Sequence, residues 1–336
     1  MPENVKRPTR ADVARLANVS ETIVSYVING QRYVDSQKRK RVQEAIKALN
    51  YRPNNIARAL KGKSTNSILF IADQISNEHF SQIITEMDSY AYHKGCLISL
   101  CANRNDEDFL SQVMCRDYDG IIISSISFRE DYINRLVEAA IPVVLLMNRQ
   151  YPHVTDGVGR IYTGLYYGAK ECVKHLYDRG RRHIVYIDRY SQRGHFSTMD
   201  DLRYQGFVES CQELGLERHD MISGCADEAQ VIEAVKAYLA SGRKVDAFFG
   251  RNDKLACLAM NACQEAGLAV PQDIAIIGFD NSTISRFVTP KLTTMEMPRG
   301  DIGRAAIEML YQMIEGKHPE DVNLQCKLIQ RQSTAV

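Results

Sequence analysis

The chain has no tryptophan, no long apolar run and no C-x-x-C pair among its 336 residues. A membrane-spanning helix needs about 18 or more consecutive apolar residues, so none is predicted. The first residues, MPENVKRPTRADVA, lack the apolar stretch of a secretion signal, and we expect a cytoplasmic protein. In the cytoplasm the nine cysteines should be reduced thiols, because their number is odd and their spacing is not that of metal ligands. We therefore predict no disulfide, no metal, no other cofactor and no membrane partner.

Motifs that mark common catalytic sites are also missing. The chain contains no G-x-S-x-G, no G-x-G-x-x-G and no H-E-x-x-H. Its eight histidines are scattered, and His175 and His183 are expected to have structural or surface roles. Without tryptophan, any aromatic platform beneath a sugar must be Tyr or Phe. Tyr162, Tyr190 and Phe279 are candidates, although packing is the commoner use of each. The sequence does not predict an enzyme.

Charge is distributed unevenly along the chain. Residues 1–63 hold 14 Lys and Arg against five Asp and Glu, a net charge of +9, and the remaining residues carry −8. A basic segment attached to an acidic body is the electrostatic pattern of a protein that binds nucleic-acid phosphates. A basic surface that is merely solvated is the alternative, which charge alone leaves open.

Three amphipathic helices are predicted within the basic segment. Thr9 and Asp12 match a capping box at the start of the first helix. Asn18 interrupts that helix and is expected in the left-handed conformation, which Asn tolerates better than most residues. Ser20 is the expected N-cap of the second helix, and the third starts near Asp35. Their predicted core consists of Val13, Leu16, Ala17, Val24, Val27, Ile28, Val42, Ala45, Ile46 and Leu49.

Two short helices joined by a tight turn and closed by a third helix form a helix-turn-helix. The second helix of this arrangement can enter the major groove of DNA, where Glu and Thr side chains can contact bases. The expected DNA-binding side chains of this segment are Thr9, Ser20, Glu21, Thr22, Ser25, Tyr26 and Asn29. A protein-binding three-helix module is the alternative at this stage.

A possible hinge follows the third helix. Pro53 ends that helix, and Asn54 can cap a further helix of about two turns, which is marginal on its own. Its basic side chains and an exposed leucine suit a segment that orders on DNA, with the leucine inserted into a minor-groove step. The expected DNA contacts of this segment are Asn54, Ala57, Arg58 and Leu60.

From Ser67 onward, short runs rich in Ile, Leu and Val alternate with amphipathic segments. Buried parallel strands separated by helices form a doubly wound α/β unit. The pattern occurs twice, so we expect two similar subdomains with a cleft between them. The predicted strands are SILFIAD, CLISLC, DGIIIS and PVVLLM, then HIVYID, VDAFFG and DIAIIG. The predicted helices lie near 79–94, 105–116, 130–139, 163–179, 198–214, 228–241, 252–266 and 299–315.

The motifs D-V-A-x-x-A-x-V-S, V-S-x-V-x-N-G and Y-R-P-N-x-x-A-R-x-L closely resemble those of the LacI family of bacterial transcription regulators. The resemblance implies a helix-turn-helix head at 1–52, a hinge helix and linker at 53–63, and a periplasmic-binding-protein-like effector-binding and dimerisation core at 64–336. In that core, an N-subdomain would cover about 66–161 and 291–322, and a C-subdomain about 162–290 and 323–336.

Ligands of open α/β sheets contact the carboxyl ends of strands. On that rule the candidates are Asp73, Gln74, Ser124, Ser125, Asn148, Asp188, Arg251, Asn252 and Asp280. The family resemblance adds Arg203 in R-Y-Q-G-F, whose guanidinium suits vicinal hydroxyls or a carboxylate. The effector contacts that it implies are Phe80, Ser124, Asn148, Arg149, Arg203, Asn252 and Asp280. For each, a cap or a loop hydrogen bond is the alternative role.

The sequence thus predicts a homodimeric regulator, expected to be a repressor, that binds palindromic double-stranded DNA. A small-molecule effector, for which a sugar is the first expectation, would bind between the core subdomains and change operator affinity. A cytosolic sugar-binding protein, or a sugar-modifying enzyme with a helical accessory domain, is the alternative. The absence of a heptad tail favours a dimer over a coiled-coil tetramer. The residues do not specify the effector or whether it induces or corepresses.

Overall fold

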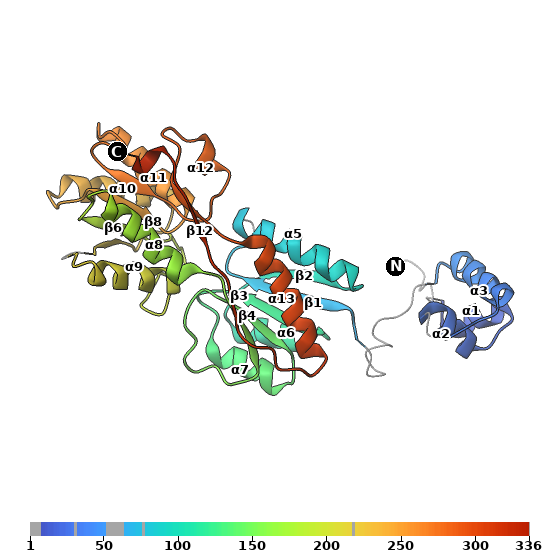
Figure 1. Cartoon of the computed structure of the whole chain (residues 1–336). Helices are drawn as coiled ribbons and strands as arrows, with labels where there is room; N and C mark the ends of the chain where they lie inside the picture. Colours follow the sequence, from blue (N-terminus) through green and yellow to red (C-terminus); the bar gives the residue numbers. More distant parts are fainter. Residues whose placement is uncertain (1–7, 30–31, 52–63, 76–77, 217–218, 336) are drawn as a thin grey trace, which may run out of the picture. The chain divides into compact units, whose positions relative to one another are not determined.

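The computed structural model describes residues 8–29, 32–51, 64–75, 78–216 and 219–335 (Figure 1). The chain divides into two compact units, Met1–Thr65 and Asn66–Val336. The first unit is helical, and the second contains parallel sheets with helices between the strands. In the described part of the chain, no helix is long and apolar enough to cross a membrane.

The first unit contains α1 (Arg10–Ala17), α2 (Glu21–Asn29) and α3 (Ser36–Ala48). The predicted capping box is confirmed, because the Asp12 amide donates to Thr9 Oγ1 and the Thr9 amide donates to Asp12 Oδ2. Asn18 follows α1 with φ 51° and ψ 54°, which confirms the predicted left-handed turn. Asp35 caps α3 through its side chain.

The small helical core is built around Val13, Val24 and Val42, none of which is exposed. Leu16, which was predicted to join it, is 55% exposed, and that prediction is wrong. The buried stripe of α1 instead runs through Val13, Ala14 and Ala17. At about 100° per residue, this stripe leaves Leu16 at its edge, where the side chain points to solvent.

In the second unit, a six-stranded parallel sheet has the order β11-β5-β4-β3-β1-β2. Its strands are β1 (Ser67–Ala72), β2 (Leu97–Ala102), β3 (Gly120–Ser124), β4 (Val143–Met147), β5 (Val158–Tyr162) and β11 (Val322–Asn323). The helices of this half are α5 (Glu78–His93), α6 (Glu107–Met114), α7 (Glu130–Glu138) and α13 (Arg299–Ile314). The strands β3 and β4 are buried along their whole length, which explains their unbroken apolar sequences.

A four-stranded parallel sheet forms the other half, with the order β7-β6-β8-β9. Its strands are β6 (Ile184–Ile187), β7 (Met221–Ile222), β8 (Ala247–Gly250) and β9 (Ala275–Ile277). Its helices are α8 (Leu165–Asp178), α9 (Leu202–Glu213), α10 (Glu228–Ala240), α11 (Asp253–Glu265) and α12 (Ile284–Phe287). The predicted doubly wound architecture is confirmed, but β5 and β7 were not predicted. β5 contains Gly159 and Arg160, and β7 has only two residues, so neither has a clear apolar pattern.

Three chain segments connect the two halves. One runs from β5 into α8 and another from β10 (Thr294–Glu296) into α13, while the third joins β11 to β12 (Lys327–Ile329). β10 and β12 pair antiparallel. The first and third segments lie in direct contact, because the Leu324 amide donates to the Tyr162 carbonyl at 2.8 Å. The carboxyl ends of the two sheets lie close to each other, because Arg189, which follows β6, lies 3.5 Å from Asp73, which follows β1.

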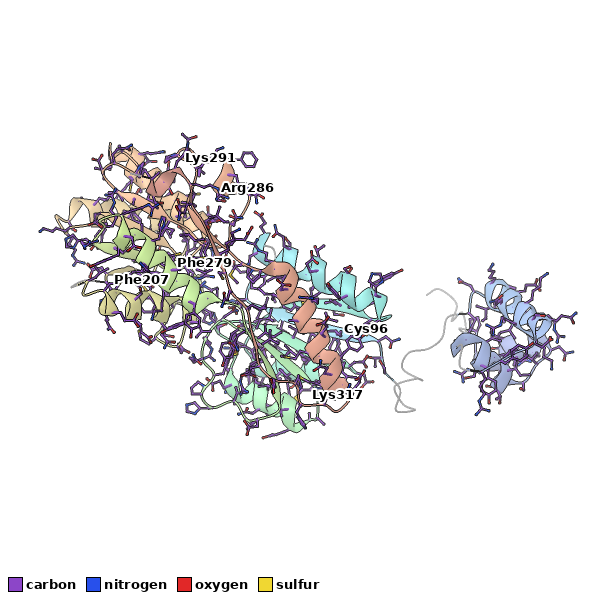
Figure 2. All side chains as sticks on the ribbon, viewed as in Figure 1. Cys96, Phe207, Phe279, Arg286, Lys291 and Lys317 are labelled. Atoms are coloured by element: carbon purple, nitrogen blue, oxygen red, sulfur yellow. The ribbon has the colours of Figure 1, made fainter. Side chains whose placement is uncertain are left out.

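A run of aromatic rings fills the core of the second half. Phe207 lies 5.1 Å from Tyr186 and 6.0 Å from Phe249 between ring centroids. Phe249 stacks on Phe279, with 6.5 Å between ring centroids. Phe207 and Phe279 are labelled in Figure 2. Phe279 lies at the end of this run nearest the crossings, and all four rings are fully buried. The run thus supplies a rigid apolar floor for the polar residues described below.

The left-handed turn at Asn18 yields a prediction for the helical unit. Asn18→Ala should destabilise residues 1–65 by about 1 kcal/mol, because a Cβ-bearing residue without a short polar side chain is strained at positive φ. Asn18→Gly should be neutral or stabilising. Thermal unfolding of the isolated unit, followed by circular dichroism, measures both. Equal stability of the Ala and Gly variants would show that the turn is not strained.

Candidate functional site

Arg203 lies at the centre of a buried polar cluster in the second unit. It is 5% exposed, and its guanidinium lies over the Phe279 ring, 4.1 Å from the ring centroid. Nη1 donates to the Arg251 carbonyl, and Nη2 lies 3.6 Å from Asp280 Oδ1. That last separation is too long for a hydrogen bond. Arg203 and Asp280, both predicted from the sequence, are thus brought together without being directly joined.

Four buried polar atoms in this cluster have no hydrogen-bond partner among the described residues. They are Arg203 Nε, Asp280 Oδ1, His79 Nδ1 and Arg299 Nε. His79 Nδ1 and Asp280 Oδ1 are 3.8 Å apart, and Arg299 Nη2 reaches only the Asp280 carbonyl. Buried polar groups are almost always satisfied, and each that is not costs about 1–3 kcal/mol. We call His79, Arg203, Asp280 and Arg299 the Arg203 cluster.

His79 is neutral at physiological pH in this environment. Burial lowers the pKa of His79 to about 4, and the nearby charges of Arg299 and Arg203 act in the same direction, against Asp280. A neutral imidazole offers one donor and one acceptor. The cluster therefore presents guanidinium donors, a carboxylate acceptor and an imidazole that can do either, which suits a ligand with hydroxyl groups.

Asp280 is held in an unusual backbone conformation. Its φ is 102° and that of Asn281 is 47°, both in the left-handed region that residues with a Cβ rarely adopt. Arg331 Nη2 donates to Asn281 Oδ1 at 2.6 Å, and Asn281 Nδ2 donates to Glu296 Oε1 at 2.8 Å. These bonds hold the turn in place. Such strain at a ligand-facing turn is typical of binding sites.

Arg251, one of the strand-end candidates, is paired within the protein. Nη2 donates to Asp201 Oδ2 at 2.5 Å, and Nε donates to Ser197 Oγ at 3.2 Å and lies 3.8 Å from Asp188 Oδ1. Burial raises the pKa of Asp201, but the charge and hydrogen bond of Arg251 outweigh this, so the net shift is downward. Arg251 is therefore a structural cation whose guanidinium is engaged by Asp201 and Ser197.

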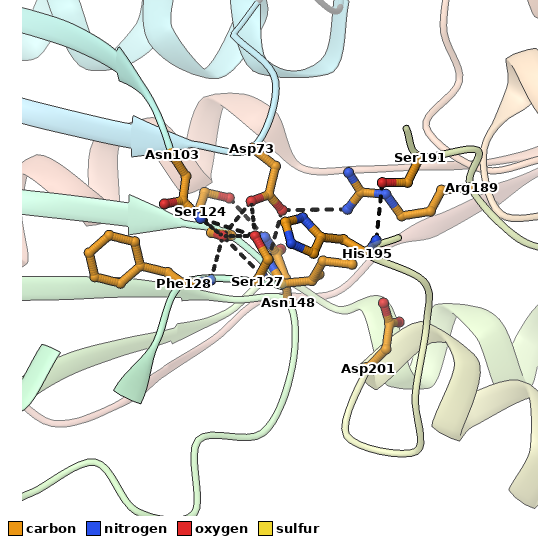
Figure 3. A network of polar contacts seen from close by, with 12 residues as sticks. Asp73, Asn103, Ser124, Ser127, Phe128, Asn148, Arg189, Ser191, His195 and Asp201 are labelled. Carbon is orange, nitrogen blue, oxygen red and sulfur yellow. Dashed lines mark hydrogen bonds and ion pairs between the residues drawn. The ribbon is translucent and has the colours of Figure 1, made fainter. Parts of the chain in front are cut away.

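A second polar network surrounds Asp73 at the end of β1 (Figure 3). Ser125 and Ser127 donate their hydroxyls to Asp73 Oδ1 at 2.5 and 2.9 Å. Arg189, which follows β6, approaches the other carboxylate oxygen to 3.5 Å. Asn103 donates to Ser127 Oγ at 3.0 Å. This network joins the carboxyl end of β1 to that of β6 through the Asp73–Arg189 pair.

The remaining predicted effector contacts have partners within the protein. Asn148 donates to Ser124 Oγ at 3.0 Å, and Arg149 donates to Asp200 Oδ2 at 2.7 Å and to the Phe128 carbonyl at 3.1 Å. Asn252 Oδ1 caps α11 by accepting from the Leu255 amide at 3.0 Å. Phe80 lies next to His79, with 5.1 Å between ring centroids. Of the predicted set, Phe80, Arg203 and Asp280 therefore lie in or against the Arg203 cluster.

His79 and Arg299 were not predicted from the sequence. Each lies at the start of a helix, α5 and α13, and neither follows a strand directly. Arg299 comes after Met297 and Pro298, where the crossing chain enters α13. Its burial beside Asp280 depends on that crossing, which no local pattern reveals. The adjacency of His79 to the predicted Phe80 was the only available signal.

The carboxyl group of Asp253 has a pKa that is shifted by its surroundings. It is 1% exposed and accepts from the Ser282 amide and hydroxyl at 2.6 and 2.8 Å. Burial, together with the charge of Asp280, raises the pKa of Asp253 to about 7. This carboxyl therefore titrates near neutral pH directly beside the Arg203 cluster.

Several of the predicted DNA-contacting side chains of the head lie at or near the start of α2. Ser20, Glu21 and Thr22 are exposed, and the Ile23 amide lies 3.4 Å from Ser20 Oγ in a capping position. Tyr26 is half-buried, with the Arg32 guanidinium 5.4 Å from its ring centroid. Ser25 is also half-buried. This end of α2 thus presents polar side chains to solvent.

Other predicted DNA contacts are engaged elsewhere or lie outside the described residues. Thr9 is exposed but donates its hydroxyl to Asp12 Oδ2 at 2.6 Å. The predicted hinge contacts Asn54, Ala57, Arg58 and Leu60 lie outside the described residues, as does the side chain of Asn29.

The raised pKa of Asp253 predicts how stability depends on pH. Between about pH 4 and about pH 7, the folded protein retains a proton that the unfolded chain loses, so stability falls as pH rises, by at most about 1.4 kcal/mol per pH unit. Asp253→Asn should flatten this slope in urea unfolding, whereas Asp301→Asn at an exposed position should not. An unchanged slope in Asp253→Asn would show that Asp253 titrates normally.

Comparison with known proteins places these features in a family. Residues 9–54 match the model of bacterial regulatory proteins of the lacI family, and residues 173–334 match a periplasmic binding protein-like domain. The "HTH-type transcriptional repressor PurR" of Histophilus somni (strain 129Pt) is 31% identical over 334 residues, covering 97% of this chain and 98% of that protein.

Two solved structures show the same architecture. A lac repressor dimer bound to operator and the anti-inducer ONPF has a TM-score of 0.83 at 25% identity, covering 98% of this chain and all of that one. A periplasmic binding protein/LacI transcriptional regulator from Alkaliphilus metalliredigens QYMF, complexed with D-xylulofuranose, has a TM-score of 0.65 at 29% identity, covering 81% of this chain and all of that one. The chain belongs to the lacI family of bacterial regulatory proteins.

Proposed function

We propose that this protein is a cytoplasmic, homodimeric transcriptional repressor whose affinity for a palindromic DNA site is set by a small-molecule effector. In this proposal the helix-turn-helix head spans 1–52, the hinge helix and linker 53–63, and the effector-binding and dimerisation core 64–336. The PurR relatives are named as repressors, and the lac repressor structure is a dimer on its operator. These likenesses support the non-catalytic role over a sugar-modifying enzyme.

The observation that carries the effector proposal is the set of unsatisfied polar atoms in the Arg203 cluster. A bound hydroxyl that accepts from Arg203 Nε and donates to Asp280 Oδ1 would satisfy both atoms at once. The effector we propose is a sugar or a related polyhydroxylated metabolite. The D-xylulofuranose complex of the Alkaliphilus relative supports this class.

The mechanism we propose is linkage between the core and the head. His79 and Arg299 lie at the starts of α5 and α13, in the half with the six-stranded sheet. Arg203 and Asp280 belong to the half with the four-stranded sheet. A ligand that contacts all four residues therefore joins the two halves. Such a ligand favours one relative orientation of the subdomains. In the proposed dimer, that orientation determines whether two hinge segments can pair on DNA. Two heads on one site then raise affinity through effective concentration.

The effector proposal predicts a ligand-dependent gain in stability. An effector at 100 times its dissociation constant should stabilise the protein by about 2.7 kcal/mol, which a thermal-shift screen of sugars, sugar phosphates and purines can detect. Arg203→Ala should abolish the shift, whereas Arg304→Ala, at an exposed position on α13, should retain it. A shift that survives Arg203→Ala would place the ligand elsewhere.

The head proposal predicts the effect of two substitutions on DNA binding. A preferred site is first selected from random double-stranded DNA, and affinities are measured at fixed salt. Tyr26→Ala and Leu60→Ala should each weaken binding to it by at least about 1 kcal/mol, through a lost base contact and a lost minor-groove insertion. Gln43→Ala on α3, at an exposed position, is the control. If neither variant differed from this control, the assigned docking mode would be wrong.

A further inference from the structure

A cavity of about 330 Å³ lies where the first and third crossing segments meet the starts of α8 and α9. Tyr162, Gly164 and Tyr167 line it on one side, and Gln205 and Gln325 on another. None of the four residues of the Arg203 cluster contributes to its lining. Its volume is at the lower end of the roughly 300–1,000 Å³ typical of small-molecule sites.

The helix α8 begins at this cavity without a side-chain cap. Its N-cap is Gly164, with φ 87°, and a Cβ at this position would lie 2.9 Å from the Cys326 backbone nitrogen and 3.0 Å from the Leu324 carbonyl oxygen. The close contact between the two crossing segments therefore requires glycine. Glycine has no side chain to accept from the first-turn amides of Tyr166 and Tyr167, and both of these residues line the cavity.

Two further polar atoms at the cavity lack partners among the described residues. Thr163, which is 3% exposed, has no hydrogen bond to its Oγ1, and Gln205 has none to its Oε1. Gln205 Nε2 is engaged, since it donates to Glu209 Oε1 at 2.7 Å. The cavity thus offers an unused acceptor on Gln205 and, on Thr163, a hydroxyl that can donate or accept.

The lining defines the ligand class. Its polar side chains are amides and hydroxyls, and no charged side chain contributes to it. Hydroxyl groups both accept and donate, so a ligand rich in hydroxyls can accept from these amides and donate to Gln205 Oε1. Tyr162, Tyr166 and Tyr167 add aromatic surface, and Tyr167 is 73% exposed. Aromatic rings beside neutral hydrogen-bonding groups suit the alternating C–H and O–H surfaces of a carbohydrate.

We propose that this cavity is a second ligand site, separate from the Arg203 cluster, for a neutral polyhydroxylated molecule the size of a monosaccharide. Adjacent residues of α9 separate the two sites, because Arg203 is directed to Phe279 and Asp280 while Leu202 and Gln205 line the cavity. A molecule bound here contacts the first and third crossing segments, and so lies against the chain that connects the subdomains.

The test uses the full-length protein carrying Arg203→Ala, which removes the proposed effector site. Binding of D-glucose and D-ribose, each alone, is measured by saturation-transfer difference NMR. We expect saturation transfer to at least one of them. Adding Thr163→Val or Gln205→Met should weaken its binding at least tenfold, and Thr163→Ser should leave it nearly unchanged. Gln212→Met, at an exposed position further along α9, is the matched control.

Two results would overturn the proposal. One is no saturation transfer from folded Arg203→Ala protein to either of these sugars. The other is binding that Thr163→Val and Gln205→Met, both shown to be folded by circular dichroism, leave at the level of the Gln212→Met control. Because Arg203 is absent throughout, neither result bears on the effector site proposed at the Arg203 cluster.

Discussion

The pairing of Arg251 with Asp201 and Asp188 is the interaction on which the Arg203 cluster depends. Asp188 and Asp201 are both 2% exposed, and breaking such a pair by removing one partner costs about 3–5 kcal/mol. The pair also positions α9, because Asp201 caps that helix by accepting from the Arg203 and Tyr204 amides at 3.0 and 3.2 Å. The same carboxylate thus holds Arg251 and sets the direction of Arg203.

One consequence is that Arg203 is buried without a carboxylate at hydrogen-bond distance. The Phe279 ring packs against the Arg203 guanidinium, and the turn at Asp280 fixes the carboxylate oxygen Oδ1 3.6 Å from Arg203 Nη2. Packing and backbone bonds therefore prevent these groups from relaxing onto each other. A site whose polar groups are held apart in this way is preorganised, so a ligand that bridges them gains affinity at little ordering cost.

Much of the fold could be predicted because it depends on local patterns. Runs such as those of β3 and β4 can only be buried strands, and Asn18 and Ser20 mark the helix-turn-helix by their turn and capping chemistry. Leu16 was misassigned because a short helix has few residues to define its buried stripe. β5 and β7 were missed because they lie toward the sheet edges, where an apolar run is not required.

The candidate site could be predicted only in part. Asp280 follows a strand, and the resemblance identified Arg203, but His79 and Arg299 reach the cluster through α5 and through a chain crossing between subdomains. Such contacts depend on tertiary topology and leave no local signal. Conversely, Arg251 and Asn252 follow a strand as ligand contacts do, yet the structure uses one as a buried counter-ion and the other as a helix cap.

The most direct test of the linkage between cleft and DNA is reciprocity. The affinity of a stabilising effector is measured by calorimetry for the free protein and for the protein saturated with its selected DNA site, and DNA affinity is measured with and without effector. Linkage requires that the two affinities change by the same factor, typically 5–150-fold. Equal effector affinity for free and DNA-bound protein would contradict the account, because the cleft and the head would then be uncoupled.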